Sequence, residues 1–198
     1  STAYYYYFLN LMMEFAGLAG HAEDIPYFRQ EADRVQEAFN RTYLSPDRQY
    51  YGDNLLTDNL LPLAFGIVPA ELEKTILARI EQIISSYGDH LSSGVVGVQW
   101  LMRTLSRNGM EDLAYRLATR TTYPSWGYML QHGATTIWEL WNGNTAAPDM
   151  NSQNHVMLLG DLLVWYYEDL AGIRSHPGSH AFKKLLMRPS FPEGLEHV

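Results

Sequence analysis

Apolar residues recur at helical spacing along most of this chain, and this periodicity constrains the fold more than any other feature. Phe28, Ala32, Val35 and Phe39 follow the i, i+4, i+7, i+11 pattern of one helix face. No strand pattern interrupts the succession of helices until residue 183, so we expect a mainly α fold. Helices are predicted at 2–19, from Asp24 to a turn at 42–53, at 57–66, from Pro69 to Tyr87, and at about 97–107, 111–119 and about 153–170; a linker is predicted at 173–181 and a strand at 183–188.

The first predicted helix, at 2–19, carries one apolar stripe. Its buried side is predicted to be the stripe that starts at Tyr4 and continues to Leu18. The run Tyr4–Tyr7 could instead form a stacking platform, but the continuing stripe favours helix packing. Gly20 follows the last periodic residue and is a plausible stop. The predicted stripe comprises Tyr4, Phe8, Leu11, Phe15 and Leu18.

Composition excludes several classes of function. The 198 residues carry 14 Lys and Arg against 22 Asp and Glu, a net charge of −8, which argues against nucleic acid and anionic membranes as partners and suits a neutral ligand. No apolar run approaches the length of a membrane span. The absence of cysteine excludes a disulfide scaffold and a zinc–thiolate site, but it does not define the compartment, cytoplasmic, periplasmic or extracellular.

The segment 123–152 has no sustained period and is long for a loop in a compact domain, which is typical of a functional region. Within it one carboxylate, Glu139, lies between the indoles of Trp138 and Trp141. A polar group, Asn151 to His155, follows shortly afterwards. A carboxylate can act as a general base, an indole can hold the face of a sugar, and amides and imidazole can bind hydroxyls. These residues predict a carbohydrate-processing site.

The residues around Glu139 resemble the surroundings of the catalytic base in the bacterial α-L-rhamnosidases, glycoside hydrolase family 78. One departure is Leu140-Trp141-Asn142, where the family's commonest form has Arg-Trp-Asp. The other blocks that carry the resemblance are 57–69, 94–101 and 123–129 for the barrel and 182–191 for a following β-sandwich.

The resemblance implies a fold and a domain organisation. Residues 1–174 would form the C-terminal half of an (α/α)6 barrel, a toroid-like array of helical hairpins. Residues 175–198 would form a linker and the first strand of a β-sandwich, the short C-terminal β segment of the fold. A half-barrel exposes its inner helices, so we also expect a tendency to form homo-oligomers.

The same resemblance implies roles for individual residues. Glu139 would be the general base of an inverting hydrolase that releases terminal α-L-rhamnose from an oligosaccharide or glycoside, and the general acid would lie outside this chain. The predicted substrate-binding residues are His155, Trp126, Trp141, Trp138, Asn151 and Asn154. No metal-ligand spacing and no nucleotide-phosphate motif is present, so we expect no metal and no other cofactor.

Two alternatives remain at this point. The chain could belong to another (α/α)6 sugar hydrolase or to a lyase, in which a Tyr or His base would replace the carboxylate. It could also be a non-enzymatic helical module that binds carbohydrate or is inactive. Several residues also have a purely structural interpretation: Asn151 and Ser152 could cap a helix that carries His155 in its first turn, and Glu139 could be a solvated loop acid.

Overall fold

The computed structural model describes residues 2–147, 149, 152–155, 161–179 and 181–196, and it is mainly helical as predicted. Two compact units divide the chain: unit 1 comprises residues 1–83 and unit 2 comprises residues 84–198. None of the described helices is both long enough and apolar enough to cross a bilayer. The helices are α1 (Thr2–Ala19), α2 (Ile25–Tyr43), α3 (Leu56–Ala64), α4 (Glu73–Ser86), α5 (Val95–Arg107), α6 (Glu111–Thr119), α7 (Trp126–Gln131) and α8 (Leu162–Trp165), and the strands are β1 (Ile173–Ser175) and β2 (Leu185–Met187).

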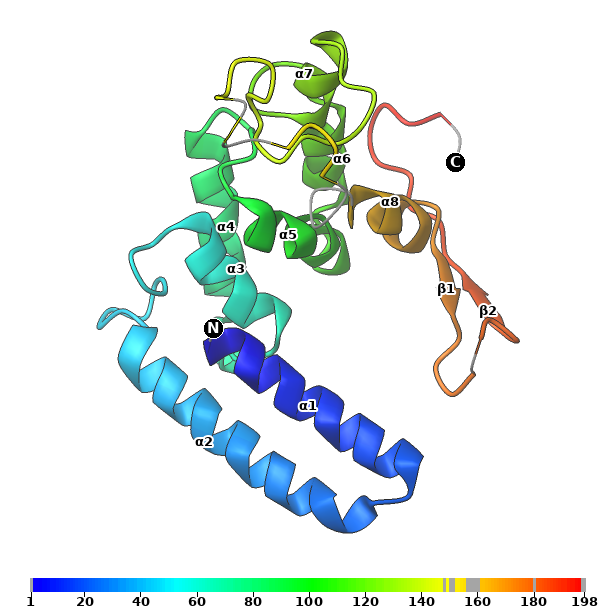
Figure 1. Ribbon diagram of the computed structural model, residues 1–198. Helices are drawn as coiled ribbons and strands as arrows, with labels where there is room; N and C mark the ends of the chain where they lie inside the picture. The colour runs from blue at the N-terminus through cyan, green and yellow to red at the C-terminus, as the bar shows by residue number, and fades with distance from the viewer. Residues whose placement is uncertain (1, 148, 150–151, 156–160, 180, 197–198) are drawn as a thin grey trace. The chain divides into compact units, whose positions relative to one another are not determined.

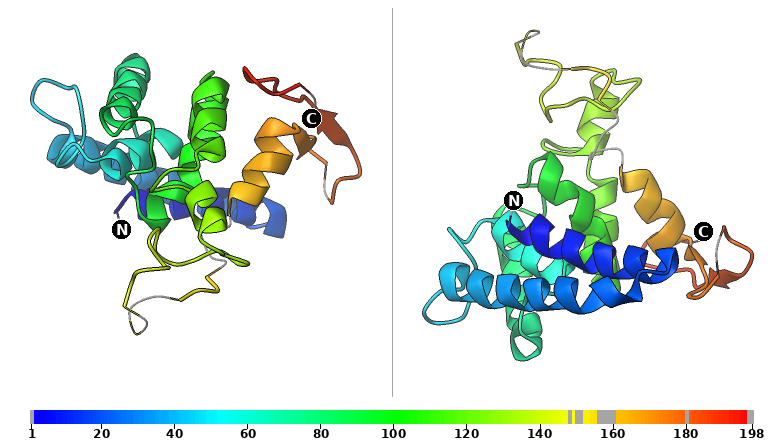
Figure 2. Two further views of the ribbon diagram at one scale, coloured as in Figure 1. Left: turned by 90° about the horizontal axis from the view of Figure 1, so that it is seen from above. Right: turned by 60° about the horizontal axis from the view of Figure 1, so that its bottom comes forward.

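Unit 1 begins with a helical hairpin. Helices α1 and α2 lie side by side and run in opposite directions (Figures 1 and 2). A 3₁₀ turn, Ala22–Asp24, joins them, and Gly20 ends α1 with φ 82°, a conformation that glycine adopts at little cost. Leu9 packs against Ala32 and Val35 in the core between the two helices. The hairpin therefore forms from the amphipathic face that the sequence of α2 predicts.

The predicted buried stripe of α1 is wrong for most of its length. Phe8, Phe15 and Leu18 are 54%, 55% and 73% exposed, whereas Leu9 and Ala16 are buried. Periodicity could not choose the face because apolar residues surround almost the whole helix, so that two different stripes satisfy the same spacing. The tyrosine run does pack as expected: the rings of Tyr4 and Tyr7 lie 5.0 Å and 4.8 Å from that of Phe65.

The predicted turn at 42–53 is confirmed, and its centre is Tyr51. This residue is fully buried, its hydroxyl donates to Asn40 Oδ1 at 2.5 Å, and its backbone N–H donates to Asn59 Oδ1 at 2.9 Å. Because Asn40 belongs to α2 and Asn59 to α3, Tyr51 ties the turn to both helices.

In unit 2, α5 and α6 form a second hairpin whose contacts bury Leu101, Leu105 and Leu117. Trp165 of α8 is also buried, and its indole N–H donates to Ser106 Oγ at 2.8 Å. Helix α8 is short and continues as a single π-helical turn, Tyr166–Leu170. The described part of unit 2 thus places α8 and this π-helical turn against α5.

The C-terminal region differs from its predicted secondary structure in two places. Residues 152–155 are not helical, although a helix was expected from about 153 to 170, and residues 156–160 lie outside the described part of the chain. The backbone N–H of His155 donates to the Ile137 carbonyl at 2.7 Å, and that of Asn154 donates to Ser152 Oγ. These donors serve a long-range contact and a local turn, which local periodicity does not reveal.

The second difference is a strand inside the expected linker. Strand β1 pairs with β2 in an antiparallel hairpin, with Ile173 opposite Met187 and Ser175 opposite Leu185. A three-residue strand is too short for an alternating pattern to identify. Strand β2 falls within the predicted strand at 183–188. The predicted domain boundary between residues 174 and 175 falls within β1, and that boundary stays a prediction.

Candidate functional site

A capped turn at the start of α7 positions Trp126. The Ser125 Oγ accepts a hydrogen bond from the Tyr128 backbone N–H at 2.9 Å, which satisfies one free donor of the helix. A Cβ at Gly127 would lie 2.3 Å from the Arg120 carbonyl oxygen, so only glycine lets α7 approach this chain so closely. This six-residue helix is too short to show a period, and for that reason the sequence predicted no regular structure there.

Trp126 supports Trp141. The two rings meet edge to face, with centroids 5.4 Å apart and an interplanar angle of 81°. Trp126 is 5% exposed, whereas Trp141 is half-buried and its indole N–H points to the Ser93 carbonyl at 3.5 Å. Edge-to-face contact of this kind fixes the plane of the outer ring. Of the two, Trp141 has the larger surface left for a ligand.

Trp138 is 4% exposed and packs under the loop that follows it. A Cβ at Gly143 would lie 2.7 Å from the Trp138 ring, closer than a side chain can approach. The indole therefore occupies the space that any larger residue at position 143 would need. Trp138 holds the 140–146 loop in place by this contact, in addition to any role in binding.

Glu139 lies where two segments distant in sequence come together. Its backbone N–H donates to the Ser152 carbonyl at 2.9 Å, and the Ser152 backbone N–H donates to Glu139 Oε2, also at 2.9 Å. Thr136 Oγ1 donates to the Gln153 carbonyl at 2.5 Å and extends the same contact. Glu139 is half-buried, and its Oε1 makes no hydrogen bond with the residues that the structure describes. One carboxylate oxygen is thus held by the 152–155 segment.

The polar residues after Ser152 continue along this contact. The His155 backbone binds Ile137, two residues before Glu139, and its side chain is half-buried. Asn154 is exposed. Asn151, the remaining predicted ligand of sugar hydroxyls, lies outside the described residues. The folded chain therefore brings the 152–155 segment to Glu139.

Further polar and aromatic groups lie beside α7 and were not among the predicted site residues. The Tyr128 ring lies 3.9 Å from that of His132 and 5.2 Å from that of Tyr123, which is 52% exposed. The Tyr128 hydroxyl lies 3.3 Å from Asn144 Oδ1, in the loop held by Trp138. The tyrosines in the Pro/Gly-rich segment 123–129 were a usable signal, because no helical stripe explains them. Figure 2 shows the irregular chain beyond α7 that carries the rest of this region.

Metal ligands do not gather in this region or elsewhere in the described parts of the chain: no group of three or more His, Asp or Glu side chains there could hold an ion. The polar groups beside Glu139 are backbone amides, hydroxyls and carboxamides. Such groups bind neutral hydroxylated molecules by hydrogen bonds.

Several known proteins are similar to this chain in both sequence and fold. Residues 1–170 match the bacterial α-L-rhamnosidase six-hairpin glycosidase domain. An α-L-rhamnosidase of Streptomyces avermitilis is 33% identical over 194 residues, which cover 96% of this chain and 18% of that protein. An α-L-rhamnosidase of Alteromonas sp. is 30% identical over 201 residues, which cover 98% of this chain and 22% of that protein.

Solved structures agree with the sequence comparison. The crystal structure of Streptomyces avermitilis α-L-rhamnosidase complexed with L-rhamnose superposes with a TM-score of 0.91 at 30% identity, covering 98% of this chain and 19% of that one. The α-L-rhamnosidase of Dictyoglomus thermophilum superposes with a TM-score of 0.88 at 33% identity, covering 96% of this chain and 21% of that one. The chain thus spans about a fifth of the length of the relatives it matches. The match over residues 1–170 shows that the chain belongs to the bacterial α-L-rhamnosidase six-hairpin glycosidase family.

Proposed function

We propose that the protein containing this chain hydrolyses terminal α-L-rhamnose from glycosides with inversion, and that Glu139 is its general base. The observation that carries this proposal is the state of the Glu139 carboxylate: Oε2 accepts the Ser152 N–H at 2.9 Å, while Oε1 has no hydrogen-bond donor among the described residues. A general base needs one oxygen positioned to take a proton from water. The backbone contact supplies the positioning and leaves Oε1 for the water.

Inversion requires a second carboxyl group. In inverting glycosidases the acid and the base lie roughly 6.5–9.5 Å apart, with room between them for the attacking water. We propose that the acid belongs to a part of the protein outside these 198 residues. Glu139 then activates the water on the face of the sugar opposite the leaving group.

The sugar would lie beside Trp141, the more exposed of the two indoles that meet edge to face. The apolar methyl group of a 6-deoxy sugar suits an indole face. The exposed carboxamide of Asn154 and the half-buried imidazole of His155 would bind ring hydroxyls. Trp126 would keep the plane of the Trp141 ring fixed. Trp138 would position the 140–146 loop, which would border the sugar. Asn151 is proposed as a further ligand of the sugar hydroxyls.

The direct test is Glu139→Gln in the full-length parent protein, assayed with an aryl α-L-rhamnoside. The amide keeps the size of the side chain, and its one oxygen can take the place of Glu139 Oε2 and accept the Ser152 N–H. The amide cannot, however, take a proton from water. We expect the rate constant to fall by about 10²–10⁴-fold or more with an unchanged melting temperature. The matched control is Glu81→Gln on the exposed face of α4, which should retain full activity.

Two further readouts separate this proposal from its alternatives. The anomer formed first should be β, as followed by NMR during the first turnovers, because inversion changes the configuration at the anomeric carbon. Added azide should restore turnover of Glu139→Gln, since this anion needs no base. Activity of Glu139→Gln within about tenfold of the parent, roughly 1.4 kcal/mol of barrier, would make Glu139 a structural loop acid. An unsaturated sugar product would indicate a lyase.

A further inference from the structure

A second polar pocket lies in unit 2, between the C-terminal end of α5, the π-helical turn Tyr166–Leu170 and the chain after β2. Its volume is about 550 Å³, within the usual range for a small-molecule site. Three arginines, Arg107, Arg174 and Arg188, line it, in a protein that has only 14 basic residues and a net charge of −8. The acids that line it are Asp169 and Glu111.

We propose that this pocket, which is independent of the Glu139 site, binds a small oxyanion, either inorganic phosphate or a carboxylate on a small organic body. Guanidinium groups match the geometry of both because they donate parallel pairs of hydrogen bonds.

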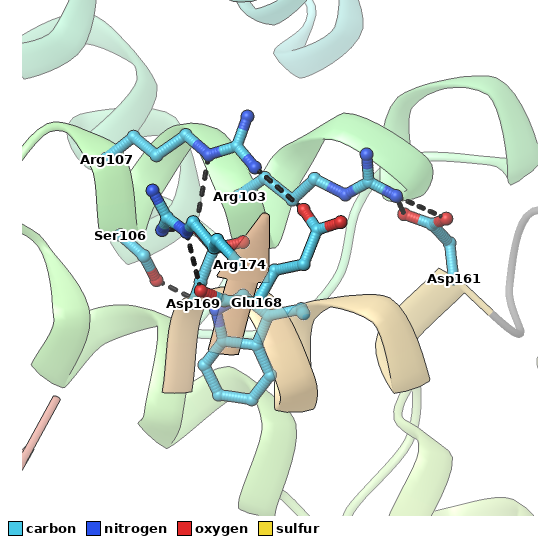
Figure 3. Close-up of polar contacts among 8 residues, drawn as sticks. Arg103, Ser106, Arg107, Asp161, Glu168, Asp169 and Arg174 are labelled. Atoms are coloured by element: carbon cyan, nitrogen blue, oxygen red, sulfur yellow. Dashed lines mark hydrogen bonds and ion pairs between the residues drawn. The ribbon is translucent and has the colours of Figure 1, made fainter. Parts of the chain in front are cut away.

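A buried carboxylate, that of Asp169, binds two of the arginines, Arg107 and Arg174. The Asp169 side chain is 0% exposed, and its Oδ1 accepts hydrogen bonds from Arg107 Nε at 3.1 Å and from Arg174 (Figure 3). Burial raises the pKa of Asp169, whereas the two arginines act in the opposite direction and favour its charged form. A buried carboxylate needs such partners, and it holds them in return.

Glu168 adds a second anchor for each of these arginines. Its Oε2 accepts from Arg107 at 3.1 Å, and its backbone carbonyl accepts from Arg174 Nε at 2.6 Å. Each guanidinium has five N–H donors and uses two of them in these contacts, so further donors remain. The two groups are therefore oriented before a ligand arrives, which reduces the entropy lost on binding.

Arg188 differs from the other two. Its backbone N–H donates to the Gly172 carbonyl at 3.0 Å, which fixes the start of its side chain beside the hairpin. Its side chain is exposed, and its guanidinium forms no hydrogen bond or ion pair with any residue in the described parts of the chain. A cation at the edge of a pocket with no protein partner suits a ligand of opposite charge.

Hydroxyl groups complete the set of donors. Ser106 Oγ accepts from the Trp165 indole, so its own hydrogen is free to be donated elsewhere. The Ser190 backbone N–H donates to the Leu170 carbonyl at 2.8 Å, and Ser190 is one of the residues that line the pocket. The hydroxyls and the remaining guanidinium N–H groups are the donors offered to an oxyanion, while Asp169 Oδ2 is a buried acceptor without a hydrogen-bond partner among the described residues.

The test is titration of the purified protein with inorganic phosphate at constant ionic strength, with chloride as the balancing anion, followed by calorimetry or by amide NMR. We expect saturable binding to the parent and a loss of at least tenfold in affinity for Arg188→Gln. The matched control is Arg29→Gln, which removes the same charge from the exposed side of α2 in unit 1. Arg188 supports no side-chain contact in the described fold, so its variant should remain folded, which the melting temperature checks.

Glucuronate and glucose, titrated in the same way, distinguish the two sources of the oxyanion. Binding of glucuronate but not of glucose indicates an organic carboxylate, and binding of phosphate alone indicates an inorganic ion; either supports the site. Failure of every anion to saturate, or equal weakening by Arg29→Gln, overturns the proposal, because the effect would then be one of overall charge. Glu139→Gln should bind phosphate like the parent, so the two sites are judged separately.

Discussion

Tyr51 shows how a single polar side chain supports the turn of unit 1. Its hydroxyl and its backbone N–H bind Asn40 and Asn59, and no part of the residue is exposed to water. Burial raises the pKa of the Tyr51 hydroxyl to about 12, because the phenolate would lose its hydration. The sequence around it, rich in turn residues, predicted the turn but not this dependence.

This pKa leads to a prediction for alkaline solution. The folded state keeps the proton between pH 10 and 12, whereas Tyr51 of the unfolded state loses it near pH 10. The stabilising contribution is therefore complete below pH 10 and is lost as the pH rises toward 12, by about 3 kcal/mol in total. Urea unfolding at several pH values checks this. In Tyr51→Phe the free energy of unfolding should no longer fall between pH 10 and 12 by this amount. A control substitution of the exposed Tyr27 by Phe should leave the fall unchanged. The same dependence on pH in all three proteins would contradict this prediction.

Glu139 is the residue of the candidate site to which the sequence pointed most directly. The pattern of one carboxylate between two indoles identified the residue, and the family to which the chain belongs agrees with the predicted resemblance. The contact with Ser152, thirteen positions away, had no signal in either segment. Trp126 and Trp138 are almost fully buried, so their predicted contact with a sugar stays a prediction, while their packing roles are visible.

At the scale of elements, the β1–β2 hairpin depends on one glycine. Gly172 has φ 68°, and a Cβ there would lie 1.9 Å from the Arg188 carbonyl oxygen. Because Arg188 N–H binds the Gly172 carbonyl, this close approach also fixes the edge of the arginine pocket. The residues of β2 are exposed, and the close backbone approach at Gly172 is one of the contacts that position the hairpin.

We therefore expect Gly172→Ala to destabilise the protein by about 3 kcal/mol or more, since the side chain adds a steric clash to an unfavourable φ. Gly178→Ala is the matched control, because its φ is also positive, at 77°, but nothing lies within 4 Å of the added Cβ. That substitution should cost only about 1–2 kcal/mol. Urea denaturation of both variants measures the difference. Equal destabilisation would mean that the hairpin does not depend on the contact with Arg188.

At the scale of the whole molecule, the chain leaves an apolar face of α1 open. Tyr5, Phe8, Met12, Phe15 and Leu18 are each at least 41% exposed. Contiguous apolar surface of this kind promotes association in water. The tendency to form homo-oligomers, which the sequence suggested for exposed inner helices, stays a prediction, and this face is where we expect it to arise.

The 198-residue chain should accordingly self-associate with rising concentration, as sedimentation velocity can measure. Phe15→Glu places a charge on the apolar face and should shift the protein toward monomer while the helical circular dichroism stays constant. Gln30→Glu is the control, because it adds the same charge to an exposed position on α2. A monomeric parent protein, or an equal shift in the control, would contradict this interpretation.

The sequence by itself determined the mainly helical fold, the limits of most helices and the identity of the carboxylate at the candidate site. These properties depend on neighbours within one or two helical turns, such as the stripe of α2 and the capped or glycine-terminated helix ends. Such signals are local, so they survive in the sequence without any knowledge of what each face meets.

The tertiary structure alone decided which face of α1 is buried, where the chain after Ser152 runs, and which strand β2 pairs with. It also brought Arg107 beside Asp169 and Arg174, more than sixty positions away. These outcomes depend on contacts between distant segments, and several local patterns satisfy the same spacing equally well. Packing and the satisfaction of buried polar groups choose among them, and that choice is made only when the segments meet.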